Sequence, residues 1–315
     1  MNNFQYIKNN DINREQWDKC VSESINSRVY ALSWYLDIVC KNWDGIIFGD
    51  YEAVFPVIFK KIFFIKKSYH PLFCQQLGLF YKNENLINKD NLILFHRFFK
   101  KHFNEYSFCS TSEFAAHFTQ LKSSSLFLES MNSIFWNSQT NLELDLKRNY
   151  NDIKDLYNKN TIRNLKKSKS YNLKIQKNLS VNTFLELYKT NKKIKKSIKN
   201  FFSFNDNYSI IRHLIYTCLS KNKGQLIAVF DQKNNIASAA FFLSCFNRYI
   251  MLFNVTNPIF KKYHGMTFLV DYFIQYNSNQ FNVLDFEGSN LDGVRKFYSG
   301  FGSLSKPYFS FQKLK

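Results

Sequence analysis

The stretch that decides the fold is QLIAVFDQKNNIASAAFFLSCFNRYIMLFNVTNP, residues 225–258. It holds three apolar runs, Gln225–Phe230, Ile236–Cys245 and Arg248–Val255, with short polar segments between them. Apolar runs of this length that are joined by tight polar turns predict consecutive strands paired antiparallel. Asn257-Pro258 ends the series, because proline has no amide hydrogen to donate to a sheet.

The chain after these strands alternates helices with strands. Phe260–Tyr276 carries apolar residues at helical spacing and predicts a helix. Asn282–Phe286 then predicts a short strand, Leu291–Tyr298 a helix and Ser305–Phe311 a last strand. The order from residue 225 onward is therefore β-β-β-α-β-α-β, with the helices expected to flank the sheet.

Residues before this region predict further strands and helices from weaker patterns. The alternation of apolar and polar residues over Leu142–Leu146 predicts a strand. Helices are expected at Asn151–Ser170 and Val181–Lys195, with a strand at Leu173–Gln176 between them. Pro56 suits an edge strand or a bulge. In the first half we expect strands at Phe4–Ile7, Ile46–Phe48, Glu52–Phe59, Gln76–Phe80 and Tyr106–Ser110, and helices at Asp11–Glu23 (capped by Asp11), Ser33–Lys41 and Asn88–His102.

The two halves repeat a similar order of elements, which predicts an α/β (α+β) protein with a tandem arrangement. The expected domains are residues 1–140 and 141–315, each with a mixed, mostly antiparallel sheet flanked by helices. A length of 315 residues fits two domains of ordinary size. The 45% of hydrophobic and 21% of charged residues argue against wholesale disorder.

Composition and spacing argue against several classes of protein. No apolar run reaches about 18 residues, so we expect no transmembrane helix, and Met1–Phe4 does not open an apolar signal core. The six cysteines form no C-x-x-C pair and are expected to be reduced and buried, and the six histidines show no metal-ligand spacing. No P-loop, G-x-G-x-x-G or G-x-S-x-G motif stands out, which disfavours P-loop nucleotidases, Rossmann enzymes and serine hydrolases.

The positive charge is concentrated in one part of the chain. The net charge is +19, and residues 159–199 contain 13 basic residues and a single acid, Glu186. Such a segment attracts phosphates, nucleic acid or an anionic membrane. The alternative is a set of lysine-rich, solvated helix faces.

The junction Thr256–Thr267, between a strand and a helix, is the first candidate site. A helix N-terminus offers unpaired amide hydrogens and a partial positive charge, which favour an anion. Lys262 and His264 lie beside it, and Gly265 would let the backbone approach a phosphate closely. The alternative is that Gly265 serves only close packing.

The run LDFEGSN, residues 284–290, is the second candidate site. Because side chains alternate along a strand, Asp285 and Glu287 are expected to share one face. Carboxylates there could take a proton from an amine or hold an ammonium group. Tyr298, on the following helix, could act as a general acid to a leaving group. The alternatives are solvated acids, Asn290 as a helix cap, and aromatic packing of Tyr298.

Arg163, Lys166 and Lys167 form the third candidate site. They are three and four residues apart, so they share a helix face. An arginine fork and lysine point charges suit phosphate groups. A solvated face is the alternative.

These motifs carry a resemblance to the GNAT acyltransferase superfamily. The order β-β-β-α-β-α-β, the junction Lys262-x-x-Gly265-x-Thr267 and the ending Asn290…Phe297-Tyr298-x-x-Phe301-Gly302 are similar to that superfamily. Its acyl-CoA loop is usually Arg/Gln-x-x-Gly-x-Gly/Ala, from which this chain departs at Lys262 and Thr267.

More narrowly, the chain resembles the FemAB-like proteins, relatives of the peptidoglycan bridge-forming aminoacyltransferases, in which two GNAT-like domains pack together. The resemblance rests on the tandem halves, the Leu142–Leu146 strand followed by Arg163-Asn-Leu-Lys-Lys, and Asp285-Phe-Glu-Gly-Ser-Asn. It is weaker over residues 1–140. The short segment between Lys195 and Gln225 has no room for the coiled-coil arm of some members.

The resemblance implies an N-acyltransferase that moves an acyl or aminoacyl group to an amine of a cell-wall or surface-glycan precursor. The implied donors are the co-substrates acyl-CoA or aminoacyl-tRNA, with no tightly bound cofactor and no metal. The implied partners are a small-molecule or lipid-linked amine, tRNA and a peripheral membrane contact. The implied location is the cytoplasm, including the inner face of the membrane.

The resemblance also implies a role for each candidate residue. The implied roles are amine positioning or proton abstraction for Asp285 and Glu287, leaving-group assistance for Tyr298, donor phosphate binding for Lys262, His264 and Gly265, and binding of an acidic substrate for Arg163, Lys166 and Asn290. Two other functions stay open. One is a basic module that binds tRNA or another nucleic acid without catalysis, and the other is an inactive scaffold that binds a nucleotide-sugar or lipid-linked precursor.

Overall fold

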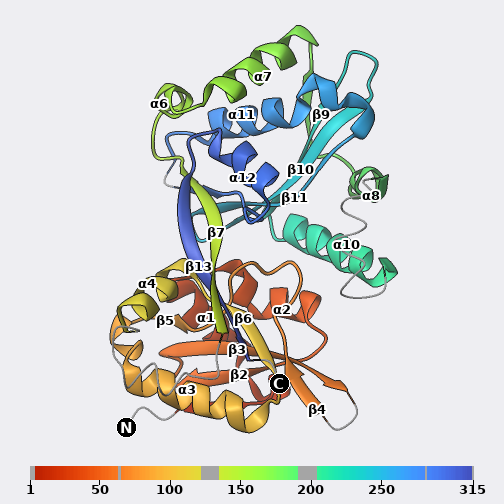
Figure 1. The fold of residues 1–315 in the computed structure, drawn as a ribbon. Coiled ribbons are helices and arrows are strands. Elements are labelled where there is room, and N and C mark those ends of the chain that lie inside the picture. The colour runs from red at the N-terminus through yellow and green to blue at the C-terminus, as the bar shows by residue number, and fades with distance from the viewer. Residues whose placement is uncertain (1–3, 63–64, 122–134, 191–203, 281, 314–315) are drawn as a thin grey trace. The chain divides into compact units, whose positions relative to one another are not determined.

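The computed structural model describes residues 4–62, 65–121, 135–190, 204–280 and 282–313. The chain forms two compact units (Figure 1), the first of Met1–Thr140 with Lys306–Lys315 and the second of Asn141–Ser305. The last ten residues, which we expected in the second domain, group with the first unit. The reason is pairing, because the end of β13 (Leu304–Lys313) lies antiparallel to β6 (Tyr106–Cys109).

The sheet of the first unit is antiparallel. Its strands are β1 (Phe4–Ile7), β2 (Trp43–Phe48), β3 (Ala53–Ile62) and β4 (Ile65–Ser68), in that order, with β5 (Phe80–Tyr81) also paired to β3. Pro56 pairs with Gly45 in the internal strand β3, so the expected edge position is wrong. It lies where β3 changes partners from β5 to β4, so its missing amide hydrogen interrupts neither pairing.

The helices of the first unit are α1 (Arg14–Glu23), α2 (Ser33–Val39), α3 (Lys89–His102) and α4 (Ser112–Leu121), with short 3-10 turns at Asn9–Asp11, Val29–Ala31 and Glu84–Leu86. Asp11 does not cap α1, because the Asn13 side chain accepts the hydrogen bond from the Gln16 amide. The strand expected at Gln76–Phe80 is reduced to β5. Helix α4 was not anticipated.

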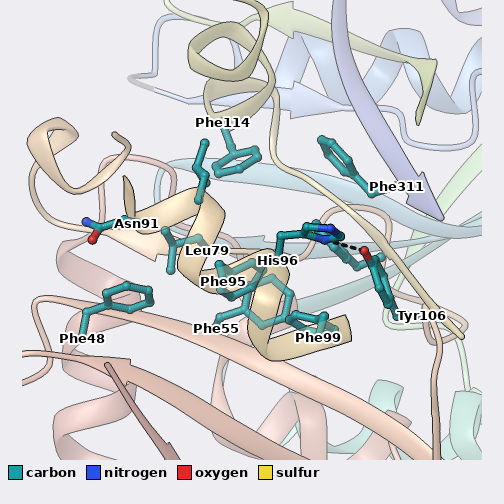
Figure 2. Close-up of a pocket in the computed structure, with 12 residues that line it drawn as sticks. Phe48, Phe55, Leu79, Asn91, Phe95, His96, Phe99, Tyr106, Phe114 and Phe311 are labelled. Carbon is teal, nitrogen blue, oxygen red and sulfur yellow. Dashed lines mark hydrogen bonds between the residues drawn. The ribbon is translucent and has the colours of Figure 1, made fainter. Parts of the chain in front are cut away.

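Aromatic side chains fill the core of the first unit. Figure 2 shows the rings of Phe55, Phe95 and Phe99 gathered around a small apolar cavity, where the Tyr106 hydroxyl lies 2.8 Å from the His96 ring. The cavity has about 30 Å³, which is room for about one water molecule. It is a packing gap, too small for an organic ligand.

The sheet of the second unit has the predicted three-stranded antiparallel centre. It contains β9 (Gly224–Phe230), β10 (Ile236–Cys245) and β11 (Arg248–Thr256), with β8 (Lys174–Lys177) beyond β9, and β12 (Val283–Asp285) and then the end of β7 (Phe135–Asp145) beyond β11. The order β-β-β-α-β-α-β from residue 225 is confirmed.

Helices cover both faces of this sheet. They are α6 (Tyr150–Asp155), α7 (Lys159–Ser170), α8 (Val181–Thr190), α10 (Phe204–Ser220), α11 (Gly265–Asn277) and α12 (Asp292–Ser299). Phe242 stacks on Phe273 of α11 at 3.7 Å between ring centroids. On the other face Phe253 meets Tyr188 of α8. Both hydrophobic layers are therefore closed by helices, as a mixed sheet requires.

Two expected helices are interrupted. The helix expected over Asn151–Ser170 divides into α6 and α7, because Asn158 caps α7 by accepting from the Thr161 amide. The helix expected over Phe260–Tyr276 divides into a 3-10 turn, η4 (Pro258–Tyr263), and α11. The part of the helix expected at Val181–Lys195 that follows Thr190 lies outside the described residues.

Candidate functional site

The candidate site lies in the second unit, where β11 and β12 part. The two strands pair in parallel from Arg248 opposite Val283 to Ile250 opposite Asp285. β12 ends there, whereas β11 continues to Thr256. The pairing of β11 with β10 also shifts register next to Met251, which is a bulge that increases twist. The edge of β11 beyond Ile250 therefore turns away from β12.

Tyr298 of α12 lies in the space between the two strands. Its hydroxyl accepts a hydrogen bond of 3.1 Å from the Asn254 side chain on β11. The ring stacks on Phe286 at 4.6 Å, and the residue is 5% exposed. Burial raises the pKa of Tyr298 to about 12, so the phenol keeps its proton at neutral pH. A phenol that accepts one bond in this way can donate its own proton to a bound group.

Glu287 lies next to this phenol. The residue has a positive φ of 49°, and its backbone amide donates to the Asp285 carboxylate at 3.0 Å. Its side chain is partly buried, and burial raises the pKa of Glu287 to about 8. The charge of Glu287 in turn contributes to the raised pKa of Tyr298. A carboxyl group with this pKa exchanges protons readily near neutral pH.

The expectation that Asp285 and Glu287 share a strand face is wrong. β12 ends at Asp285, and the left-handed backbone at Glu287 takes the second acid off the strand. Arg248 holds Asp285 at 2.8 Å and Glu143 at 2.7 Å. The Asp285 side chain is 1% exposed. This arrangement supports a positioning role for Asp285, since it fixes the backbone that carries Glu287.

An open groove of about 1210 Å³ begins at the end of β11. Thr256 lines it, two residues after Asn254 and on the same face of the strand. Phe297, the neighbour of Tyr298, lines it from α12. The groove and the Tyr298 cluster therefore share the elements β11 and α12, although Tyr298, Asn254 and Glu287 do not line the groove. Its other walls are η4 and the first turn of α11, with Asn164 of α7 and Thr190 at the end of α8. The residues of η4 and α11 include Lys261, Lys262, His264, Gly265 and Thr267.

The N-terminus of α11 opens on this groove. His264 precedes the helix in the left-handed conformation, and its side chain makes no capping hydrogen bond. Burial lowers the pKa of His264, and the charges of Lys167 and Arg163 on α7 lower it further. The basic face of α7 therefore lies close enough to act electrostatically on this junction. Two separate parts of the sequence, α7 and the segment of η4 with the first turn of α11, therefore bring positive charge to one groove.

No protein-family model matches this sequence, and no curated protein matches it either. The crystal structure of FemX matches with a TM-score of 0.66 at 10% identity, covering 97% of this chain and 96% of FemX. The C-terminal domain (DUF2156) of a putative lysylphosphatidylglycerol synthetase from Agrobacterium fabrum matches at 0.53, with 10% identity and coverage of 96% and 91%. L-PGS from Bacillus licheniformis matches at 0.54, with 9% identity and coverage of 94% and 90%.

The chain therefore has the fold of FemX, a mixed α/β fold with two sheets flanked by helices. At these identities the match establishes the architecture, and the roles of individual residues have to be argued from the geometry.

Gly265 of this FemX-like fold packs tightly. A Cβ atom there would lie 3.0 Å from the Ser238 hydroxyl and 3.2 Å from the Ala237 Cβ on β10. Close packing of α11 on the sheet is therefore one reason for glycine here. The residue also lines the groove, so the two interpretations are compatible.

The remaining predicted residues, Arg163, Lys166 and Asn290, are exposed. Arg163 donates to the Asn160 side chain at 2.5 Å, and Lys166 lies on α7. Asn290 does not cap α12, whose N-cap is Leu291.

Sequence reasoning missed Asn254 and Arg248. Both lie in the strand RYIMLFNVT, where a polar residue among apolar ones was the available signal.

Two further findings hold for the described residues only. No group of three His, Cys, Asp or Glu side chains could hold a metal ion there. No helix in that part of the chain is long and apolar enough to cross a membrane.

Proposed function

We propose that this protein is a FemX-like N-acyltransferase that moves an acyl or aminoacyl group from an activated donor to an amine. The observation that carries the proposal is the cluster of Tyr298, Asn254 and Glu287 at the parting of β11 and β12, beside the basic groove. In this proposal Glu287 is the proton acceptor and Tyr298 the proton donor, and the groove that shares β11 and α12 with them holds the donor. Transfer between an ester or thioester and an amine needs these two functions.

The chemistry assigns one step to each group. Glu287 takes a proton from the attacking ammonium, and the freed amine nitrogen forms a bond to the donor carbonyl carbon. The tetrahedral oxyanion is held by amide hydrogens along the edge of β11. When the bond to the leaving oxygen or sulfur breaks, Tyr298 gives that atom its proton, and the phenolate takes back the second proton that the nitrogen loses as it becomes an amide. Holding the two substrates together supplies roughly 7–11 kcal/mol of the rate enhancement.

The groove would take the phosphate end of the donor. The open N-terminus of α11 favours an anion. Lys261 and Lys262 line the same groove, and Arg163 and Lys167 act on it from α7. Acyl-CoA and aminoacyl-tRNA both carry phosphates on the molecule that bears the activated carbonyl, so both are donors for the assay. The acceptor proposed is an amine of a cell-wall or surface-glycan precursor, reached in the cytoplasm or at the inner face of the membrane.

The test is a transfer assay with the full chain. Acetyl-CoA, longer acyl-CoA or charged tRNA is mixed with amino sugars and lysine-containing peptides, and products are identified by mass spectrometry. Tyr298→Phe and Glu287→Gln should each lower kcat by roughly 10²-fold or more. Tyr276→Phe is the matched control, because Tyr276 is 58% exposed and lies outside the site. If both site variants turn over like the wild type, this mechanism is wrong.

A non-catalytic tRNA-binding module is the second candidate, and the basic face of α7 favours it. Phosphate contacts would then give binding a steep dependence on salt. tRNA that binds with such a slope while no donor is consumed would support this second function. Loss of that binding in Arg163→Met with Lys166→Met would assign it to α7.

A further inference from the structure

A second hollow lies in the first unit, away from every residue used above. It is open, has a volume of about 530 Å³, and is lined by residues of β1, the end of α2, β2, β3 and β4. Four lysines, Lys8, Lys41, Lys61 and Lys66, line it together with Tyr6 and Phe59. Two acids also line it: Asp44, and Asp37, which pairs with Arg14 at 3.3 Å. We call this hollow, with its four lysines, the lysine hollow.

Lys66 is fixed within the lysine hollow. Its ammonium nitrogen donates to the Tyr6 hydroxyl at 2.6 Å and lies 3.7 Å from the Asp44 carboxylate. It also lies 3.9 Å from the centroid of the Phe59 ring, as a cation–π contact requires. The Lys66 side chain is 27% exposed. These contacts hold one positive charge in a defined position at the wall.

The other lysines add positive charge that the protein does not balance. Lys61 lies directly opposite Lys66 in the β3–β4 pair, and like charges in that position destabilise a sheet. Burial lowers the pKa of Lys66. The charge of Asp44 raises this pKa, whereas the charges of Lys61 and Lys8 lower it further. Lys8, Lys41 and Lys61 form no ion pair with any acid in the described part of the chain.

A second pair of lysines lies on the opposite face of the same hairpin, and the protein itself offsets its positive charge. Lys60 and Lys67 also lie directly opposite each other. There, Lys67 pairs with Glu105 at 2.8 Å, and the Lys60 ammonium lies over the Tyr69 ring at 5.7 Å. On the face of the lysine hollow Asp44 of β2 pairs with Lys66 only, so the position beside Lys61 has no acid from the described part of the chain. An external anion would occupy that position.

We propose that the lysine hollow binds the phosphate group of a small molecule. Asp44 offsets one of the four ammonium groups, so the remaining charge suits an anion with more than one negative charge rather than a single carboxylate. Ammonium groups bind phosphate as compact point charges and need no planar partner. The concave shape and the volume are in the range of small-ligand sites and not of an extended polymer track.

The test measures binding of inorganic diphosphate to the full chain by calorimetry and by thermal unfolding at constant ionic strength. Lys61→Met should weaken the affinity by about tenfold, because one phosphate contact is lost. Lys60→Met is the matched control, since it removes a neighbouring exposed lysine of the same strand on the other face. Lys8→Met is a second variant at an exposed position, which avoids disturbing the contacts of Lys66.

A second measurement, of binding to lipid vesicles, identifies whether the phosphate comes from a soluble ligand or from a lipid headgroup. The same variants are sedimented with phosphatidylcholine vesicles with and without phosphatidylglycerol. Binding that is lost in Lys61→Met and kept in Lys60→Met supports the proposal. If diphosphate itself binds in this way, the phosphate belongs to a soluble ligand. If only the anionic vesicles bind in this way, it belongs to a lipid headgroup. Equal responses of the two variants, or the same stabilisation by sodium chloride alone, overturn it.

Discussion

Replacing Arg248 by methionine tests whether the ion-paired cluster below the site holds Glu287 in place. One guanidinium nitrogen lies 2.7 Å from Glu143 and 2.8 Å from Asp285, whose side chains are 9% and 1% exposed. Arg248→Met keeps a stem like that of arginine, removes the guanidinium, and leaves two buried carboxylates without a cation. Breaking a buried pair by removing one partner costs about 3–5 kcal/mol, because the remaining charge is uncompensated.

The loss should depend on pH in a defined direction. In the variant two buried carboxylates face each other without the guanidinium between them, and their repulsion acts only while both are ionised. The difference from the wild type should therefore be largest near neutral pH and smallest in acid.

The assay is urea unfolding followed by circular dichroism, at several values between about pH 4.5 and about pH 8. In thermal unfolding the same loss corresponds to a fall of roughly 10 °C for a unit of this size. Arg14→Met is the control, because Arg14 pairs with Asp37 at 3.3 Å with both side chains well exposed, where about 1 kcal/mol or less is expected. A loss in Arg248→Met no larger than in this control, or one that does not change with pH, would refute the reasoning.

Three further predictions concern the site and the packing around it. In the transfer assay kcat/KM should rise with pH through about 8, because Glu287 must lose its proton to act as a base, and Glu287→Gln should flatten that profile. Tyr298→Phe should lower kcat roughly 10²-fold while leaving KM for the donor nearly unchanged, as steady-state kinetics would show. Gly302→Ala should lower the free energy of unfolding by about 1–3 kcal/mol, because φ is +80° and the new Cβ would clash with the Leu156 Cβ. Gly293→Ala, which meets open space in α12, should be neutral or slightly stabilising in the same urea titration.

The sequence predicts the strands of the second unit well because their signal is local. β10 matches its expected bounds, Ile236–Cys245, and β9 and β11 differ by one residue at an end. Apolar runs bounded by Asn-rich turns determine both the strands and their antiparallel pairing. By contrast, the division between α6 and α7 depends on a contact with residues far along the chain. The Asn158 amide donates to the Gly300 carbonyl at 3.0 Å, and no periodicity within residues 150–170 could reveal that bond.

The candidate site shows the same limit in chemical terms. From spacing alone Asp285 and Glu287 are equivalent acids, two residues apart at the end of a strand. The structure separates them, because Arg248 fixes the first, whereas the second turns off the strand toward Tyr298. A carboxylate bound tightly to a cation is a poor base, while a partly buried one with a raised pKa near neutrality is a good one. The assignment of the base therefore depends on Arg248, a residue 37 positions earlier whose partner cannot be identified from the sequence. Glu287 is for this reason the acid whose substitution should change the pH profile, and Asp285 the one whose loss should act through the backbone that carries it.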